Sequence, residues 1–413
     1  MHRRLLSAFY LFSVLLALTY AAQAQTFQVL HTFEGPDGTS SGALVVDSQG
    51  NLYGTASQGG INNCNTFGCG TVFELSPSQS GWSFATLYKF QSKTEGWNPA
   101  APLTIGPGGI FYGATVDGGI EGGGGTVFRL APICTDPACK QKLWSKTTLY
   151  SFGACNGAGT NGGLVLDKAG NLYGTTIAAC TKRGQVYELS PAQEIQGNWN
   201  LTVIHPFAGA PSDGGWLLAT LLIDNSGNLY GPTFSGGSSN VGTIYRLSHQ
   251  GKAWEEDLLY VFNGLDVIHP INSLISDSSG NFYGVTYGDQ QPSVAFKLSN
   301  VDGSWEFSQL YTFLPGQAQE LTSGLVMDSA GNLYGVGSGG VFGYGAVYKL
   351  TQTPNGWIYS TEHDFTGGSD GASPSGPLTL DTDGNLYGSA SAGGDLNCIP
   401  GIGCGTVWMI TPN

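Results

Sequence analysis

The sequence predicts an all-β protein, a seven-bladed β-propeller built from four-stranded antiparallel blades. Three observations carry this prediction. The phrase D-x-x-G-N-L-Y-G recurs at spacings of 51 to 61 residues, with its tyrosine at Tyr53, Tyr112, Tyr173, Tyr230, Tyr283, Tyr334 and Tyr387. Each repeat holds four short β-rich runs, and the order of these runs at the two ends of the chain fits a closed ring.

The four runs are clear in the first repeat. They are "GALVV", "NLYGTA", "GTVFEL" and "WSFATLYKF", here called strands A, B, C and D. Gly, Pro, Asn and Asp separate such runs, which is typical of consecutive antiparallel strands. Four strands in a repeat of about 50 residues is the period of a propeller blade.

The turn between strands A and B explains the Asp and the Gly of the repeated phrase. Asp47 can cap the turn through its carboxylate, and Gly50 can supply a positive φ. Six of the seven copies keep the aspartate, and the second copy has Gly106 in its place. A calcium loop is the alternative, but one carboxylate per turn falls short of the roughly six to eight oxygen ligands that calcium takes. We therefore interpret the phrase as structural.

The two ends of the chain determine the number of blades. A D-type run, "VLHTF" at 29–33, precedes the first A strand, and the chain ends just past the seventh C strand, "GTVWMI". Seven sets of A, B and C strands therefore pair with seven D strands only if the N-terminal strand completes the last blade. This closure removes the free sheet edges that promote aggregation. We expect a single domain over residues 25–413.

The first 24 residues have the features of a targeting segment. They combine a positive start (His2-Arg3-Arg4), an apolar run over 5–18 and a small-residue cleavage site at Ala22-Gln23-Ala24. The apolar run is short for a membrane span, and no later run approaches the roughly 20 apolar residues that a span needs. We predict a signal peptide over residues 1–24 and export to the periplasm or the extracellular medium.

Eight cysteines in an exported chain favour disulfides. The blade assignment places each predicted pair within one loop or between loops that emerge together. The predicted disulfides are Cys64–Cys69, Cys134–Cys139, Cys155–Cys180 and Cys398–Cys404. None of these couples has the paired C-x-x-C spacing of a structural zinc site, so the sequence indicates neither a metal site nor a cofactor.

Charge and composition narrow the range of partners. The formal net charge of −14 makes nucleic acid and anionic membrane surfaces poor partners. Charged residues are only 11% of the chain, glycine reaches 65 of 413 residues, and aromatic residues recur regularly. This combination is typical of a turn-dense β protein rather than of a disordered chain, which lacks the aromatics.

The repeated phrases resemble a known group of proteins. D-x-x-G-N-L-Y-G, a Gly-Gly loop, G-T-V-F/Y-x-L and L-Y-x-F follow one another as in the GloVer tandem repeats of exported bacterial proteins, over nearly all of residues 26–411. Strands A and B also resemble NHL-type propeller repeats. The Gly59-Gly60 doublet resembles kelch repeats, although the later Tyr and Trp spacing of kelch is missing. The resemblance implies export and a repeat architecture, and it implies no activity and no functional residue.

The loops of a propeller indicate where a ligand binds. D–A and B–C loops emerge on one face, and A–B and C–D connections emerge on the other. In this chain the D–A and B–C loops are long and variable, while the A–B turns are short and uniform. Binding residues gather on variable loops held by a rigid scaffold, so we expect a site on the D–A/B–C face, at the mouth of the central channel.

Two tryptophans stand outside the repeat pattern. Trp97 and Trp216 lie in D–A loops, whereas the other seven occupy repeated strand positions. An exposed aromatic side chain in a loop can stack on a sugar ring or anchor a protein partner, and the alternative is a loop pinned by its own tryptophan. Acidic residues of D–A loops and one histidine complete the predicted ligand-binding set: Glu95, Asp213, Asp266 and His269.

The sequence offers little support for catalysis. A catalytic triad needs a nucleophile, a base and an orienting group together, and His269 is alone on the candidate face, so no catalytic residue is predicted. The leading hypothesis is a secreted, non-catalytic propeller that binds a glycan or protein ligand. One alternative is an extracellular carbohydrate-active enzyme, a polysaccharide lyase or a glycoside hydrolase, that uses two acids of this face. The other is a structural component of the cell surface or matrix.

Overall fold

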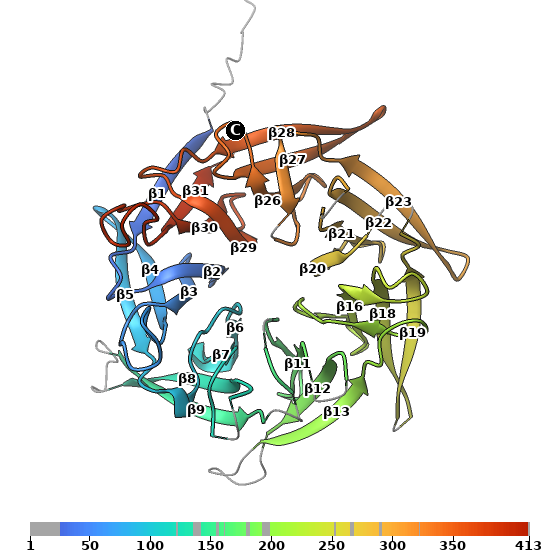
Figure 1. Ribbon diagram of the computed structural model, residues 1–413, viewed down its shortest axis with the longest axis horizontal. Coiled ribbons are helices and arrows are strands. Elements are labelled where there is room, and N and C mark those ends of the chain that lie inside the picture. Colours follow the sequence, from blue (N-terminus) through green and yellow to red (C-terminus); the bar gives the residue numbers. More distant parts are fainter. Residues whose placement is uncertain are drawn as a thin grey trace, which may run out of the picture.

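Seven antiparallel sheets surround a central axis in the computed structural model of the chain (Figure 1). The structure describes residues 25–411 apart from short gaps at 121–122, 135–141, 154–156, 161, 179–181, 192–198, 252, 265–267, 289–290 and 322. Each of these sheets is one blade. In blades 1 to 6 the strands follow one another from the axis outwards in chain order, and in blade 7 the first strand of the chain is the outermost. The predicted fold, a seven-bladed β-propeller, is confirmed.

The first three blades each have four strands in the order A, B, C, D. Blade 1 comprises β2 (Thr39–Val46), β3 (Leu52–Gln58), β4 (Thr71–Ser78) and β5 (Gly81–Lys89). Blade 2 comprises β6 (Thr104–Ile105), β7 (Phe111–Thr115), β8 (Thr126–Cys134) and β9 (Lys142–Ser151), and the short 3-10 helices η1 (Lys93–Glu95) and η2 (Pro107–Gly109) lie beside it in sequence. Blade 3 comprises β10 (Val165–Leu166), β11 (Leu172–Thr176), β12 (Gln185–Ser190) and β13 (Asn200–Pro206).

The next three blades keep this order with small additions. Blade 4 comprises β15 (Leu222–Ile223), β16 (Leu229–Thr233), β18 (Thr243–Gln250) and β19 (Ala253–Val261), and a separate pair, β14 (Gly214–Gly215) and β17 (Ser235–Gly236), joins its loops. Blade 5 comprises β20 (Pro270–Ser276), β21 (Phe282–Thr286), β22 (Val294–Val301) and β23 (Ser304–Thr312). In blade 6, β24 (Ala318–Leu321) and β25 (Val326–Met327) both pair with β26 (Leu333–Gly339), which β27 (Ala346–Thr353) and β28 (Gly356–Asp364) follow.

Blade 7 closes the ring with the two ends of the described chain. It comprises β29 (Ala372–Leu380), β30 (Leu386–Ala392), β31 (Thr406–Thr411) and, as the outermost strand, β1 (Thr26–Thr32). β1 runs antiparallel to β31, with Phe27 opposite Ile410 and His31 opposite Val407. In Figure 1 the blue first strand lies against the red last one. The predicted closure by the N-terminal strand is confirmed.

The apolar core is divided among the junctions between blades. Seven clusters of buried side chains are present among the described residues, and each draws on two neighbouring blades. The cluster between blades 7 and 1, for example, joins Tyr387 and Val407 to Phe33 and Phe73. Because every blade buries its faces against two neighbours, the ring is rigid enough to hold variable loops in fixed positions.

The A–B turns have the structural role that their sequence predicts. In blade 1, Asp47 Oδ1 accepts hydrogen bonds from the backbone N–H groups of Gln49 (2.8 Å) and Asn51 (2.9 Å). Its Oδ2 accepts from Asn51 Nδ2 (2.9 Å) and from the Tyr53 hydroxyl (3.2 Å). The carboxylate is thus occupied by donors of its own turn.

Two of the predicted disulfides, Cys64–Cys69 and Cys398–Cys404, are present. Cys134 is also disulfide-bonded, while its predicted partner Cys139 and the predicted pair Cys155–Cys180 lie outside the described residues. Disulfides persist in oxidising compartments. The predicted signal peptide, residues 1–24, is likewise outside the described part of the chain. Within that part, no helix has the length and apolar character needed to cross a membrane.

Candidate functional site

The D–A and B–C loops meet on one face of the ring. In blade 1 the Gly60 N–H donates to Gly35 O (3.2 Å), and in blade 4 the Gly237 N–H donates to Asp213 O (2.9 Å), each bond joining a B–C loop to a D–A loop. Of the fifteen large apolar side chains that are exposed among the described residues, nine lie on this face: Phe67, Ile120, Trp216, Leu314, Val341, Phe342, Tyr344, Leu396 and Ile402. The loops of this face therefore carry most of the exposed large apolar side chains among the described residues.

A cavity of about 390 Å³ lies on this face, where the loops of blades 3, 4 and 5 meet. It is lined by Arg183, Ala208, Gly209, Ala210, Trp216, Phe234, Ser235, Asn240 and His269. Two of the predicted ligand-binding residues, Trp216 and His269, therefore share one site. We call these lining residues the aromatic cavity.

Aromatic rings form one wall of the aromatic cavity. Trp216 lies nearly parallel to Phe234, with ring centroids 6.4 Å apart and an interplanar angle of 25°. Phe234 is stacked on His269 at 4.3 Å and 11°, and the ring centroid of Tyr287 lies 6.4 Å from that of Phe234. Trp216 remains 45% exposed, so it presents a flat apolar surface to solvent.

A continuous series of hydrogen bonds fixes these rings in place. The Trp216 N–H donates to Arg183 O (2.6 Å), and the Phe234 N–H donates to Trp216 O (3.1 Å). His269 Nδ1 lies 2.7 Å from Phe234 O, and the Tyr287 N–H donates to His269 O (2.9 Å). Because a carbonyl oxygen only accepts, His269 Nδ1 carries the proton of this bond. The wall is therefore preorganised across three blades.

Two of the aromatic residues occupy an unfavourable backbone conformation. Trp216 has φ 59° and His269 has φ 53°, in the left-handed region that bulky residues seldom adopt. The D–A loop of blade 2 has Asn98 (φ 60°) in this conformation, and that of blade 7 has Ser373 (φ 51°). Left-handed backbone at a bulky residue costs about 1–3 kcal/mol and concentrates at functional sites. The same loop position of blade 6 is also left-handed at Glu320 (φ 38°), so the conformation recurs around the ring, and in blades 4 and 5 it carries an aromatic side chain.

The remaining predicted site residues do not line the aromatic cavity. Trp97 is half-buried against the apolar cluster of blades 1 and 2, and its backbone pairs with Asp117. Glu95 accepts hydrogen bonds from the Tyr88 hydroxyl of β5 (2.9 Å) and from the backbone N–H of Gln91 in its own loop. Asp266 lies outside the described residues. Trp97 and Glu95 therefore belong to the loop that enters blade 2, away from Trp216.

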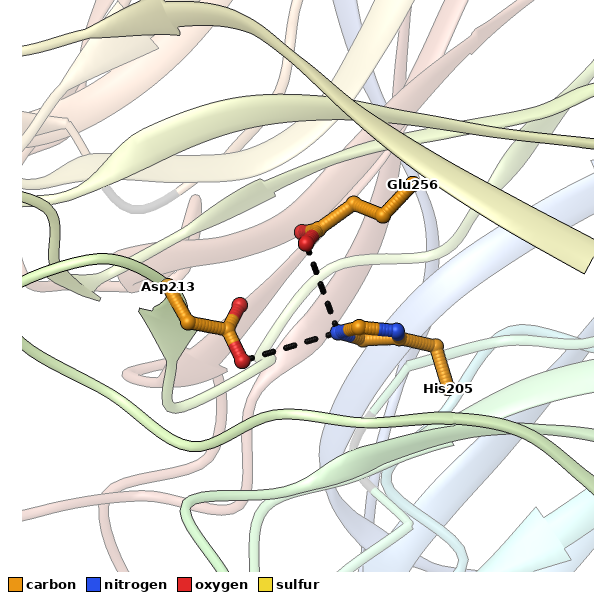
Figure 2. Close-up of side chains that lie close together, drawn as sticks. All are labelled: His205, Asp213 and Glu256. Carbon is orange, nitrogen blue, oxygen red and sulfur yellow. Dashed lines mark ion pairs between the residues drawn. The ribbon is translucent and has the colours of Figure 1, made fainter.

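Asp213 lies in the loop that carries Trp216, but its carboxylate takes part in a different cluster. It converges with His205 and Glu256, as Figure 2 shows. Asp213 Oδ2 and Glu256 Oε2 are each 3.5 Å from His205 Nε2. Burial raises the pKa of Asp213. His205 and the backbone N–H groups of Ala208 and Gly214 lower this pKa by more, so the net pKa lies below its ordinary value.

Sequence reasoning missed Phe234 and Arg183, although a signal for Phe234 exists. Four residues after the repeated tyrosine, blades 4 and 5 have Phe234 and Tyr287, while the other blades have Ser, Val or Ile. A comparison of the repeats at this position therefore indicates an aromatic pair. Arg183 carries no such signal, because its side chain is placed by the fold: an added Cβ on Gly215 would lie 2.8 Å from Arg183 Cβ.

A second cavity lies at the centre of the ring and is lined by fewer functional groups. It measures about 260 Å³ and is lined from several blades by small and apolar residues such as Ala43, Ala100, Pro102, Ala219 and Pro377. No charged side chain lines it among the described residues. The aromatic cavity adjoins it in sequence, through Trp216 and Leu218 and through His269 and Ile271.

Comparisons with known proteins agree with the repeat and add no activity. The family model described as the Gloeobacter/Verrucomicrobia repeat matches residues 15–215, which confirms the resemblance of the repeated phrases. No curated protein matches the chain. Among solved structures, a gluconolactonase from Xanthomonas campestris is similar with a TM-score of 0.42 and 11% identity, covering 94% of this chain and 90% of that one. A structure of a nidogen/laminin complex is similar with a TM-score of 0.40 and 15% identity, covering 64% and 81%. These likenesses are too distant to bear on function.

Proposed function

We propose, from the premise that this chain carries the Gloeobacter/Verrucomicrobia repeat folded as a propeller, that it is a non-catalytic binding protein that takes a glycan into the aromatic cavity. The observation that carries the proposal is Trp216, which is 45% exposed and fixed in a left-handed backbone conformation beside Phe234. A flat aromatic ring held in this way packs against the C–H face of a sugar ring.

The other lining residues fit a sugar ligand. Arg183 and Asn240 can donate hydrogen bonds to hydroxyl or carboxylate oxygens. A volume of about 390 Å³ is at the lower end of known small-ligand pockets, which suits a short stretch of a glycan chain. The rings are already in position, so little ordering of the protein opposes binding.

The lining residues favour binding over hydrolysis. A glycoside hydrolase needs a pair of carboxyl groups on either side of the scissile bond, and the described lining of the aromatic cavity contains no carboxylate. His269 is its only general acid or base, and its Nδ1 is engaged with Phe234 O. The enzymatic alternative is therefore the less favoured one.

A protein partner is the second candidate ligand. The B–C loop of blade 6 exposes Val341 (73%), Phe342 (57%) and Tyr344 (50%) on the same face. A cluster of exposed apolar side chains of this kind is typical of a protein contact.

The proposed location is outside the cytoplasm, in the periplasm or the extracellular medium. The disulfides Cys64–Cys69 and Cys398–Cys404 and the targeting features of residues 1–24 support it. Mass spectrometry of the protein from fractionated cells tests this proposal. A non-cytoplasmic chain that begins at Gln25 is expected, and a reduced, full-length cytoplasmic chain would contradict it.

Binding and turnover on a panel of polysaccharides and oligosaccharides test the proposed function. The wild-type chain is compared with Trp216→Asn, which installs the type of residue that blade 2 has at Asn98, and with Phe342→Ala, which removes another exposed aromatic side chain of the same face. We expect at least one glycan to bind without release of reducing or unsaturated ends. Trp216→Asn should weaken binding by about 30-fold or more, as loss of an aromatic anchor does.

The two variants separate the outcomes. Trp216→Asn should melt no lower than the wild type, because a small polar residue tolerates the left-handed conformation better. Phe342→Ala should leave glycan binding unchanged. Equal glycan binding by Trp216→Asn, release of sugar ends, or a panel without any bound glycan would each contradict the proposal.

A further inference from the structure

A cluster of three potential metal ligands includes one residue of the loop that carries Trp216. His205 comes from β13, Asp213 from the D–A loop that enters blade 4, and Glu256 from β19. Figure 2 shows the His205 imidazole directed at both carboxylates. The three ligand atoms lie within 4.8 Å of one another. Three segments that are distant in sequence thus bring one nitrogen and two oxygen donors together.

The distances in this cluster differ from those of its counterparts in the ring. His205 stands two residues before the phenylalanine that ends strand D, as His31 and His363 do in two other blades. In those blades the histidine makes a hydrogen bond to the acid of the next loop: His31 Nε2 lies 2.8 Å from Asp37 Oδ2, and His363 Nε2 lies 3.1 Å from Asp370 Oδ2. In this cluster both contacts of His205 Nε2 are 3.5 Å long. The cluster is therefore wider than a hydrogen-bonded pair.

Glu256 is the residue that makes this junction different. Six residues before the phenylalanine that ends strand D, the other strands have Phe, Lys, Leu or Tyr, and only β19 has an acid. At the two counterparts an aromatic ring stacks on the histidine: Phe84 lies 3.8 Å from His31, and Phe27 lies 3.6 Å from His363. Glu256 replaces this apolar contact with a second carboxylate. It is a departure from the repeat that packing alone does not explain.

Two polar atoms of the cluster are buried without a hydrogen-bond partner among the described residues. They are His205 Nε2 and Glu256 Oε1. Leaving such atoms unsatisfied costs free energy. Within the described part of the chain, both atoms therefore lack a partner of the kind that a bound cation would supply.

We propose that His205, Asp213 and Glu256 bind a divalent transition-metal ion, with zinc as the expected occupant. Imidazole and carboxylate are zinc ligands, and metal–ligand distances of about 2.0–2.2 Å place two ligands of a tetrahedral site roughly 3.3–3.6 Å apart. The two 3.5 Å separations match this spacing. The third pair, the Asp213 and Glu256 oxygens, lies within 4.8 Å and would have to come closer when the ion binds.

The surroundings of Asp213 fit a ligand that is held for a metal. Its Oδ2 accepts a hydrogen bond from the Ala208 N–H (2.5 Å), and its Oδ1 accepts from the Gly214 N–H (2.6 Å). Such outer contacts orient a ligating carboxylate. The ion would join the loop from Ala208 to Trp216 to the D strands of blades 3 and 4. This inference does not depend on glycan binding.

Zinc content and thermal stability test the site. The exported chain is purified without a polyhistidine tag, loaded with zinc, dialysed against metal-free buffer and assayed for bound zinc and melting temperature. We expect one zinc ion per chain and a melting temperature that falls when a chelator is added, because the ion stabilises only the folded state.

Glu256→Phe installs the residue that Phe84 and Phe27 provide at the counterparts, so it should fold and keep its melting temperature in chelator. It should bind zinc more than about a hundredfold more weakly, since loss of a ligand exceeds the effect of losing an outer contact. Asp37→Asn, which alters a counterpart without a third ligand, should leave the zinc content unchanged. Zinc absent from the wild type, or retained equally by Glu256→Phe, would show instead an imidazolium between two carboxylates and overturn the proposal.

Discussion

The aspartate of the A–B turn recurs from blade to blade and holds its turn together through hydrogen bonds. In blade 3, Asp167 accepts hydrogen bonds from the backbone N–H groups of Ala169 and Asn171, each at 2.8 Å. It also accepts from Asn171 Nδ2 (2.9 Å) and from the Tyr173 hydroxyl (3.1 Å). The tyrosine hydroxyl ties the turn to strand B, which explains why the repeated phrase keeps both residues. Charge-assisted hydrogen bonds of this kind are stronger than neutral ones.

The free energy of unfolding should fall in acid because of these turns. Partial burial raises the pKa of the turn aspartates, but their hydrogen bonds lower it more, and the net pKa is lowered at Asp47, Asp167, Asp224, Asp277 and Asp328. A lowered folded-state pKa gives stability that is complete above the unfolded value, near pH 4, and is lost as the pH falls through the folded value. Urea unfolding between about pH 5 and pH 2 checks this. A flat profile over that range would contradict it.

Removal of one such carboxylate should be costly, while removal of its neighbour should not. Asp167→Ala leaves four donors without their acceptor and should lower the free energy of unfolding by about 1–3 kcal/mol. Lys168→Ala changes an exposed position of the same turn and should stay within about 0.5 kcal/mol of the wild type. Chemical denaturation of both variants measures the difference. Equal free energies of unfolding would contradict the stabilising role of the turn carboxylate.

At the scale of the strands, the glycine of the repeated L-Y-G packs under an aromatic ring of strand C. An added Cβ on Gly54 would lie 2.5 Å from Phe73 Cζ, and one on Gly284 would lie 2.6 Å from Phe296 Cζ. The aromatic ring is fully buried in both blades. The phrases L-Y-G and G-T-V-F/Y-x-L are therefore two halves of one packing unit, which is why they recur together.

Gly284→Ala should destabilise the protein through this contact. The new methyl group meets Phe296 and also lies 3.0 Å from Leu274 Cδ2, so strands must shift to accept it. Overpacking of this kind costs about 1–3 kcal/mol. Gly368→Ala is the control, because its added Cβ would meet only Thr366 Oγ1 at 3.4 Å. Melting temperatures of the two variants test this prediction. An unchanged melting temperature for Gly284→Ala would show that the contact with Phe296 does not require a glycine.

At the scale of the whole molecule, the regular features were predictable and the individual ones were not. Blade number, strand order and the closure by β1 follow from repeats, because each blade buries its faces by the same contacts. Trp216 was recognised because it stands outside the repeat pattern, and His269 because it is the one histidine predicted on the variable-loop face. Their partner Arg183 was not, since it is brought to the aromatic cavity by the packing of blade 3 against blade 4. The cluster of His205, Asp213 and Glu256 was missed for the same reason, as its members come from three separate segments.

Deletion of residues 25–34 should open the ring. β1 supplies the outer strand of blade 7, and its Phe27 packs on the cluster that contains Phe365 and Trp408. Loss of this strand exposes the edge of β31, which promotes aggregation. Light scattering and thermal melting of the shortened chain measure the effect. A shortened chain that stays monomeric and melts with the full-length one would contradict the closure.

Hydrogen–deuterium exchange with the glycan selected from the panel tests the central claim, that the ligand binds at the loops of blades 3, 4 and 5, most directly. Backbone amides in peptides that contain Trp216, Phe234 and His269 should exchange more slowly in the presence of the glycan. Peptides from the A–B turns of the opposite face should exchange at the same rate with and without it. Protection confined to the A–B turns, or to loops distant from the aromatic cavity, would contradict the claim.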